Sequence, residues 1–230
     1  MKFELFGAAH WTILGLTFAT AVILIGVAKK WNDPLRLIEK FLACVLILTK
    51  LATVYIAQSD GTLTLQNGLP MHLCDWANII VIVVLFWPHQ LLYEIAYYWG
   101  IAGTIQALLT PDLRYFFPDP RFMTFFVSHI GIIVSVFFLT LGRGMRPTKF
   151  SLWKVFVVTQ FYIVVTLLTN WALDANYGYF CAKPKNPSLL DYLGAWPYYI
   201  FSMDVLALVF FFLCYAPFFI SKFAQNIRRQ

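Results

Sequence analysis

Residues 70–109 read PMHLCDWANIIVIVVLFWPHQLLYEIAYYWGIAGTIQALL. Pro88 and His89 alone separate an apolar segment of 18 residues from a second one of 20. Each segment is about as long as a helix that crosses a hydrocarbon core roughly 30 Å thick. A connection of two residues makes two such helices antiparallel neighbours. The stretch therefore predicts a transmembrane helical hairpin.

Apolar segments of similar length lie on both sides of this hairpin. Together they predict seven membrane spans, at residues 8–28, 41–57, 70–87, 90–109, 122–141, 152–173 and 197–221. Of the 230 residues, 60% are hydrophobic, 19% aromatic and only 12% charged. Because a soluble domain is about a quarter charged, this composition excludes a soluble or disordered chain. The sequence predicts an all-α membrane protein in which residues 1–230 form a single domain, one bundle of seven transmembrane helices.

Lysine and arginine are unevenly divided among the segments that connect the predicted spans. Alternate connections, with the tails included, carry 11 of them on one side and 5 on the other. Basic residues stay preferentially on the cytoplasmic side, so the C-terminus is predicted to be cytoplasmic and the N-terminus outside. The net charge of +6 then reports topology, and no nucleic-acid partner is expected. The predicted location is the cytoplasmic (inner) cell membrane, which the chain crosses several times.

Polar side chains within the spans gather toward the ends that this topology places outside. Ionisable and amide groups are costly inside a bilayer, so they are expected to face one another in the bundle or to form a site. An outward-opening polar pocket is the simplest interpretation. Lys50 is expected to pair with Asp75 or Asp204, and Glu94 to lie at the interface. The outward polar set comprises His10, His72, Cys74, Asp75, Asn78, Thr104, Gln106, Thr110, Ser128, His129, Asn170, Asp174, Tyr198, Tyr199 and Asp204.

Cys74 is the candidate nucleophile within this set. Residues three or four apart share a helical face, so Cys74 lies with Asn78 and His72 lies with Asp75 on another face. His72 is therefore badly placed to deprotonate Cys74, whereas His129 on a facing helix has no such restriction. A base beside a cysteine activates the thiol, and a nearby amide or hydroxyl stabilises the oxyanion formed when a thiolate attacks an ester. The candidate donors are Asn78, Thr104 and Gln106.

Five strings along the chain carry a family resemblance. They are LPMHLCDWAN (69–78), GTIQALLTPDL (103–113), FFVSHIG (125–131), NYGYF (176–180) and YLGAWPYYI (192–200). They resemble the bacterial YwaF-type family of integral membrane proteins, which is distantly similar to the eukaryotic transmembrane protein 164 group of cysteine-dependent lipid acyltransferases. The resemblance implies acyl transfer from a phospholipid to a lysophospholipid, with Cys74 as nucleophile and His129 as its partner. Asp75 and His72 would orient groups or hold charge. No cofactor is expected, because the donor ester already carries an activated acyl group.

The connection at 174–196 is predicted to cap the pocket and to contact a lipid headgroup. Aromatic residues suit a membrane interface, and this connection holds several of them. The predicted contacts with substrate come from Asn176, Tyr177, Trp196 and Tyr199, with Lys183 and Lys185 near the phosphate.

Alternative interpretations remain for the same residues. A transporter or receptor-like bundle would bind a small polar ligand in the pocket and use Lys50, Asp75 and Asp204 to couple ions. Cys74 could instead be a packing residue, or form a disulfide with Cys181. No metal site is predicted, because no second Cys or His pair completes the His72–Cys74 spacing. His10 and His72 are each expected as hydrogen-bond partners between helices. The sequence leaves the oligomeric state open.

Overall fold

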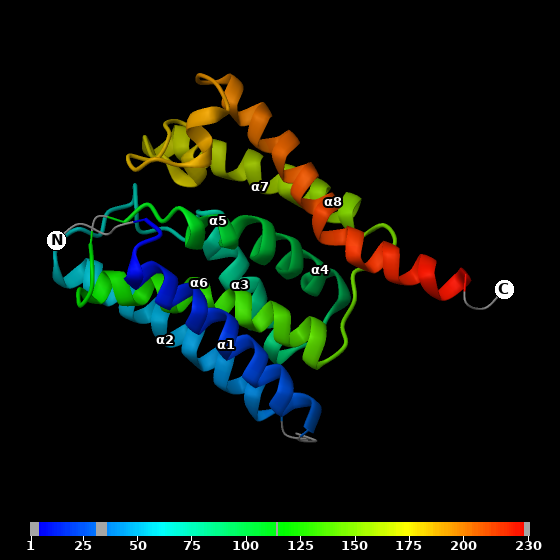
Figure 1. Cartoon of the computed structure of the whole chain (residues 1–230). Coiled ribbons are helices and arrows are strands. Elements are labelled where there is room, and N and C mark those ends of the chain that lie inside the picture. The colour runs from blue at the N-terminus through cyan, green and yellow to red at the C-terminus, as the bar shows by residue number, and fades with distance from the viewer. Residues whose placement is uncertain (1–4, 31–35, 114, 228–230) are drawn as a thin grey trace.

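The computed structural model describes residues 5–30, 36–113 and 115–227, with backbone only for 221–227. Regular structure in these ranges is helical throughout, and no strand occurs among the described residues. Helices occupy each of the seven predicted stretches (Figure 1). They are α1 (Ala8–Lys30), α2 (Leu37–Ser59), α3 (Leu73–Phe86), α4 (Gln90–Tyr98) followed by α5 (Thr104–Leu109), α6 (Pro120–Phe137), α7 (Ser151–Leu173) and α8 (Tyr198–Ile227). Two 3-10 turns, η3 (Tyr177–Tyr179) and η4 (Leu189–Tyr192), lie between α7 and α8.

Within the described ranges, five helices are long and apolar enough to cross a membrane, which makes the chain a multi-pass membrane protein. They are Ala8–Lys30, Leu37–Ser59, Pro120–Gly142, Ser151–Leu173 and Tyr198–Ile220. Helix α3 is apolar but has only 14 residues, and the predicted span at 90–109 is interrupted. The count of seven spans and the orientation of the termini therefore stay predictions. Lys2, Arg114, Arg228 and Arg229, which contribute to the basic count, lie outside the described residues.

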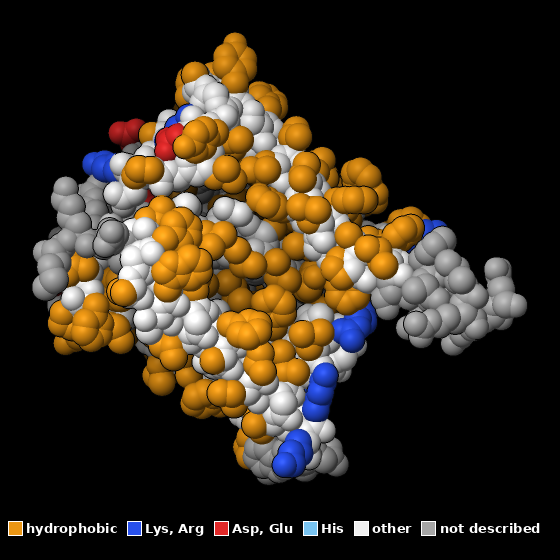
Figure 2. All heavy atoms as spheres, viewed as in Figure 1, with side chains coloured by type: hydrophobic (Ala, Val, Ile, Leu, Met, Phe, Trp, Pro, Cys, Tyr) orange, Lys and Arg blue, Asp and Glu red, His pale blue; other side chains and the backbone are white. Residues whose placement is uncertain are grey.

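The bundle has a packed centre and two lipid-facing flanks. Helix α6 contacts α1, α2, α3 and α5, while α7 packs against α4 and α8 on the opposite side (Figure 1). Buried side chains concentrate on the central helices α2, α3, α4 and α6. Large apolar side chains such as Phe18, Trp171 and Phe201 are exposed, and hydrophobic side chains cover most of the face in Figure 2, with charged ones near its edges. Such a surface is suited to lipid rather than water.

The predicted span at 90–109 is not one continuous α-helix. A π-helical segment, η1 (Trp99–Gly103), separates α4 from α5. The two glycines of this segment allow close packing: a Cβ at Gly100 would lie 2.9 Å from Val136 Cγ2, and one at Gly103 would lie 3.0 Å from Leu73 Cδ2. These glycines therefore let the segment pack closely against two different helices, α6 and α3. The change of helical period could not be anticipated, because an apolar stretch does not report it.

The end of the bundle that is predicted to be cytoplasmic is held by a buried carboxylate. Glu39 is fully buried, and its two oxygens accept from Arg143 Nε and Nη2, both at 2.7 Å. Arg36 Nε also donates to Glu39 at 2.9 Å, and Arg36 Nη2 donates to the Leu85 carbonyl at 2.9 Å. We call Arg36, Glu39 and Arg143 the inner clamp. It ties the first turn of α2 to the last turn of α3 and to the π segment η2 (Phe138–Gly142) that ends α6.

The interfacial position of Glu94 stays a prediction, but the structure gives its side chain specific partners. It is fully buried, accepts from Thr148 N at 2.9 Å and from Thr148 Oγ1 at 2.6 Å, and pairs with Lys154 at 2.5 Å. Thr148 belongs to the connection before α7, which folds back over α4, whereas Lys154 belongs to the first turn of α7. The position of Glu94 near a span end did not indicate these partners.

Candidate functional site

Cys74 is the second residue of α3. The helix begins at Leu73, and its start is fixed by the His72 backbone N–H, which donates to Asp75 Oδ2 at 3.3 Å. The first amides of a helix have no intrahelical acceptor and carry a partial positive charge, which favours an anion such as a thiolate. Cys74 is half-buried, and it is a free thiol, as are Cys44, Cys181 and Cys214. Its place in the first turn is therefore chemically favourable for a nucleophile.

An ion pair lies beside this first turn. Lys50 Nζ of α2 is 2.5 Å from Asp75 Oδ1 of α3, and both side chains are partly shielded from solvent. This geometry decides between the two aspartates considered for Lys50, because Asp204 instead accepts from Gln160 Nε2 at 2.8 Å. The charge of Asp75, next to Cys74 in the chain, is thereby balanced by a cation.

His129 presents a basic nitrogen. It is buried on α6, and its Nδ1 lies 2.7 Å from the Phe125 carbonyl, while its ring stacks on Phe125 at 4.1 Å. A carbonyl only accepts, so Nδ1 carries the proton and Nε2 of the neutral ring holds the lone pair. Nε2 makes no hydrogen bond to any described residue. The ring is thus held in the tautomer that a general base requires.

The other two outward histidines are differently engaged. His10 Nδ1 accepts from Phe6 N at 2.9 Å and its Nε2 bonds the Leu108 carbonyl at 2.7 Å, so both nitrogens serve backbone groups. His72 Nδ1 accepts from Gly178 N at 3.3 Å, which leaves the proton on Nε2. Both are hydrogen-bond partners between segments, as expected.

Cys74 and His129 are not joined by a hydrogen bond in the part of the chain that the structure describes. Their helices meet one turn deeper, where Asn78 Nδ2 is 3.5 Å from Ser128 Oγ. Asn78 lies one turn below Cys74 on the same face, and Ser128 precedes His129 in the chain. The two candidate groups therefore belong to facing stretches of α3 and α6.

Two buried polar atoms near this contact lack partners among the described residues. They are Oδ1 of Asn78 and the hydroxyl of Thr104, whose side chains are 3% and 1% exposed. Gly103, next to Thr104, contacts Leu73 at the start of α3. The side-chain amide of Gln106 likewise makes no hydrogen bond to a described residue. Unpaired buried polar groups are rare in proteins, and such groups are available to a substrate or to water.

The connection after α7 covers the outward end of α3. The Tyr177 hydroxyl accepts from Leu69 N at 2.9 Å and donates to the Leu65 carbonyl at 2.8 Å, and its ring meets that of His72 at 5.4 Å. The Tyr179 hydroxyl donates to Asp112 Oδ2 at 3.0 Å. Burial, and then the negative charge of Asp112, raise the pKa of Tyr179 above its ordinary value, so the phenol stays a neutral donor. The connection is thus fastened to two other loops.

The remaining residues predicted to contact substrate make bonds within this connection. Asn176 Oδ1 accepts from the backbone of Cys181 at 2.9 Å and of Ala182 at 3.0 Å. Trp196 is largely exposed and donates to the Phe180 carbonyl at 3.1 Å, and buried Tyr199 donates to the Tyr179 carbonyl. Their role toward a lipid stays a prediction.

The structure thus brings together, at the start of α3, Lys50, His72, Cys74, Asp75 and Tyr177, with Asn78 one turn further along the helix. It also adds residues that the sequence did not indicate: Tyr162, which donates to the Met71 carbonyl at 3.1 Å, and Tyr179 with Asp112. Tyr162 lies within an apolar helix and carries no local signal. Tyr179 belongs to the NYGYF string, where its positive φ of 59° beside Gly178 marks a tight turn.

No group of three or more His, Cys, Asp or Glu side chains that could hold a metal ion occurs among the described residues.

Comparison with known proteins identifies the family. The model of the TMEM164 family matches residues 5–215, which is most of the chain. Comparisons with curated proteins and with solved structures gave no match. The match includes every candidate site residue named above, and the chain belongs to the TMEM164 family.

Proposed function

We propose that the chain is a membrane acyltransferase in which Cys74 takes an acyl chain from a phospholipid and passes it to a lysophospholipid. The observation that carries the proposal is the position of Cys74, in the first turn of α3 beside the Lys50–Asp75 ion pair and under the Tyr177 connection. Membership of the TMEM164 family supports chemistry on membrane lipids. A lipid ester reaches such a site from the bilayer without entering water.

The proposed reaction has two steps. In the first, His129 Nε2 takes the Cys74 proton as the sulfur attacks the ester carbonyl; the C–O bond breaks, and His129 returns the proton to the departing lysophospholipid oxygen. In the second, the hydroxyl of another lysophospholipid attacks the thioester and gives its proton to His129, which restores the Cys74 thiol. Atoms and charge balance without a cofactor. Because no hydrogen bond joins Cys74 and His129 among the described residues, the proposal has the proton transferred after a side-chain rotation or through water.

The neighbouring groups have supporting roles in this proposal. Lys50 balances Asp75, so that a negative sulfur does not face an unpaired carboxylate. Thr104 and the amides of Asn78 and Gln106 are the donors for the oxyanion formed in each step. The neutral His72, with its proton on Nε2, donates toward the substrate or holds the Tyr177 connection. Asn176, Trp196 and Tyr199 shape the entrance from the lipid headgroup side.

The topology is part of the proposal. In this proposal, helix α3 and the interrupted α4–η1–α5 segment are the third and fourth of seven spans. The protein lies in the cytoplasmic (inner) cell membrane, with its N-terminus outside and its C-terminus in the cytoplasm. Cys74 then lies near the outer surface.

The experiment is intact-mass measurement of the purified protein after incubation with a phospholipid donor. The expected result is an added acyl mass that hydroxylamine removes and that is absent from Cys74→Ala. Cys74→Ser should be nearly as inactive, because a hydroxyl is far less ionised than a thiol beside the same base. His129→Ala should slow acyl transfer by about 10²- to 10⁴-fold, the usual contribution of a positioned acid–base group.

Cys214→Ala is the matched control, because Cys214 is also a half-buried free thiol but lies on α8. It should keep the adduct. Acyl transfer that persists in Cys74→Ala would contradict the proposal and favour a ligand-binding or transport bundle, in which loss of Lys50 or Asp75 rather than of Cys74 abolishes function.

A further inference from the structure

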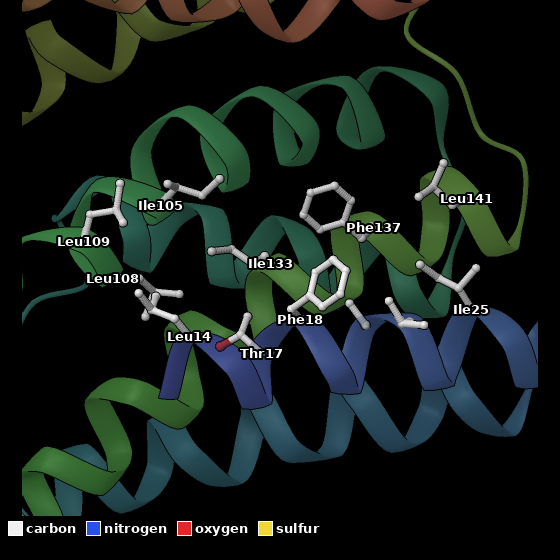
Figure 3. A pocket seen from close by; sticks show the side chains of 12 residues that line it. Leu14, Thr17, Phe18, Ile25, Ile105, Leu108, Leu109, Ile133, Phe137 and Leu141 are labelled. Carbon is white, nitrogen blue, oxygen red and sulfur yellow. The ribbon is translucent and has the colours of Figure 1, made fainter. Parts of the chain in front are cut away.

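An apolar groove runs along the inner side of α1. It has a volume of about 320 Å³ and lies between α1, α5 and the α6–η2 helix (Figure 3). Twelve residues line it, and eleven of them are apolar. The exception is Thr17, whose hydroxyl donates to the Ile13 carbonyl of its own helix at 2.8 Å and so offers nothing to a ligand. A polar molecule would find no partner there, and the groove suits a hydrocarbon.

The groove exists because α1 approaches its neighbours through small or polar residues. The buried residues of α1 are His10, Thr17 and Ala21, whereas Phe18 is 73% exposed. A Cβ placed on Gly142 would lie 3.4 Å from the Ala28 Cβ, so the two helices are closest at this end. Between these contacts the side chains of Phe18, Ile133 and Phe137 line the groove (Figure 3).

The length of the groove matches a single acyl chain. Along α1 it extends from Leu14 to Ile25, which is about 16 Å at 1.5 Å per residue. One leaflet of a bilayer fills about half of a hydrocarbon core roughly 30 Å thick. None of the described residues that line the groove is charged, so a free fatty acid would find no partner for its carboxylate among them. The fitting ligand is a chain whose polar end lies outside the groove.

The register of α1 against α6 places the outer end of the groove near His129. Both helices run in the same direction. His10 meets Leu108 of α5, which packs with Phe122 and Phe126 in the first turns of α6, and Ala28 meets Gly142 at the far end. Leu14 precedes Ala28 by fourteen residues, and Ser128 precedes Gly142 by the same number. Leu14 therefore lies roughly level with Ser128 and its neighbour His129. On α6 the lining residues Ile133 and Phe137 follow His129 at successive intervals of four, along one face.

We propose that this groove binds one acyl chain of the phospholipid donor, with the ester at the outer end near His129. The inference rests on the proposed acyl transfer. The acyl chain is then the part of the substrate that the protein recognises by shape. Because the acyl chain comes from the bilayer, its burial in the groove gains little hydrophobic free energy. Recognition therefore depends on the fit of the groove walls.

The test separates binding from chemistry. Cys74→Ala protein is placed in phosphatidylcholine nanodiscs that contain phosphatidylcholine with a diazirine midway along one acyl chain, and the cross-linked peptides are mapped after illumination. The expected adducts concentrate at residues 14–25 and 133–141. Adding Ala21→Phe, which fills the groove, should reduce these adducts by at least about fivefold, because an overpacked site rejects its ligand.

Ala19→Phe is the matched control, since Ala19 lies on α1, is exposed and does not line the groove. Val22→Phe, at a residue that lines the groove and is 52% exposed, repeats the test should Ala21→Phe unfold the bundle. Equal labelling in the groove variants and in the Ala19→Phe control would overturn the proposal. Labelling spread evenly over α1, α7 and α8 would overturn it too, because it reports bilayer lipid only.

The intact-mass experiment keeps the two proposals apart. Labelling confined to the groove without any acyl adduct on native Cys74 would support the groove and refute the acyl transfer. An acyl adduct on Cys74 with unchanged groove labelling in Ala21→Phe would support the acyl transfer and refute the groove.

Discussion

Glu39→Gln should weaken the whole bundle from the end opposite to Cys74. The substitution keeps the size of the side chain and removes its charge. In the native chain this carboxylate is fully buried and accepts three charged hydrogen bonds at 2.7–2.9 Å from Arg143 and Arg36. The helices that the inner clamp joins are α2, α3 and α6, which carry Lys50, Cys74 and His129.

The size of the effect follows from burial. Removing one partner of a buried ion pair costs about 3–5 kcal/mol, because the remaining charge stays desolvated. Arg36 and Arg143 are 32% and 25% exposed, so water screens them in part and the lower end of the range applies. A loss of about 3 kcal/mol corresponds to a melting temperature lower by about 6–12 °C for a chain of this length. Acyl transfer should fall as well, since three site helices lose a common anchor.

The measurement is thermal unfolding in detergent of the native protein, Glu39→Gln, and the control Asp119→Asn. Asp119 pairs with Arg121 at 3.1 Å, but this pair is partly exposed, and asparagine still caps α6. The control should leave the melting temperature close to that of the native protein, because water screens a partly exposed ion pair. A difference of less than about 2 °C between the melting temperatures of Glu39→Gln and the native protein corresponds to less than about 1 kcal/mol. Such a result would show that the inner clamp does not hold the helices together.

Two further predictions concern the outward side. A cysteine at exposed Thr62, in a Cys181→Ser background, should react with a membrane-impermeant maleimide added outside intact cells; reaction only after permeabilisation would reverse the predicted orientation. Tyr177→Phe removes the hydroxyl that links Leu65 to Leu69 and should destabilise the capping connection by about 1–3 kcal/mol. The expected result is faster proteolysis within 174–197. The control Tyr192→Phe, at a residue that is 87% exposed, should leave the rate of proteolysis unchanged. Equal cleavage of the two variants would remove the reason to treat Tyr177 as a fastening point.

The class of protein, and the position of each polar group along its helix, can be predicted from the amino-acid sequence alone. Apolar length is a local property, so the hairpin around Pro88 is readable along the chain, whereas the outward placement of Cys74 stays a prediction from the basic-residue count. The 3.6-residue period also places Cys74 and Asn78 on one face without knowledge of any neighbour. The helices found at 37–59, 120–142 and 151–173 agree with the predicted spans to within a few residues.

The tertiary structure decided which groups meet. Depth is a single coordinate, whereas the rotation of each helix and the choice of its neighbours depend on packing around the whole bundle. Two aspartates were compatible with Lys50, and only packing selected Asp75. The proton on His129 Nδ1 follows from the Phe125 carbonyl, and the burial of Glu94 follows from a connection that folds back over it. The groove behind α1 is likewise a space between three helices, and no single stretch of sequence encodes it because its walls come from all three.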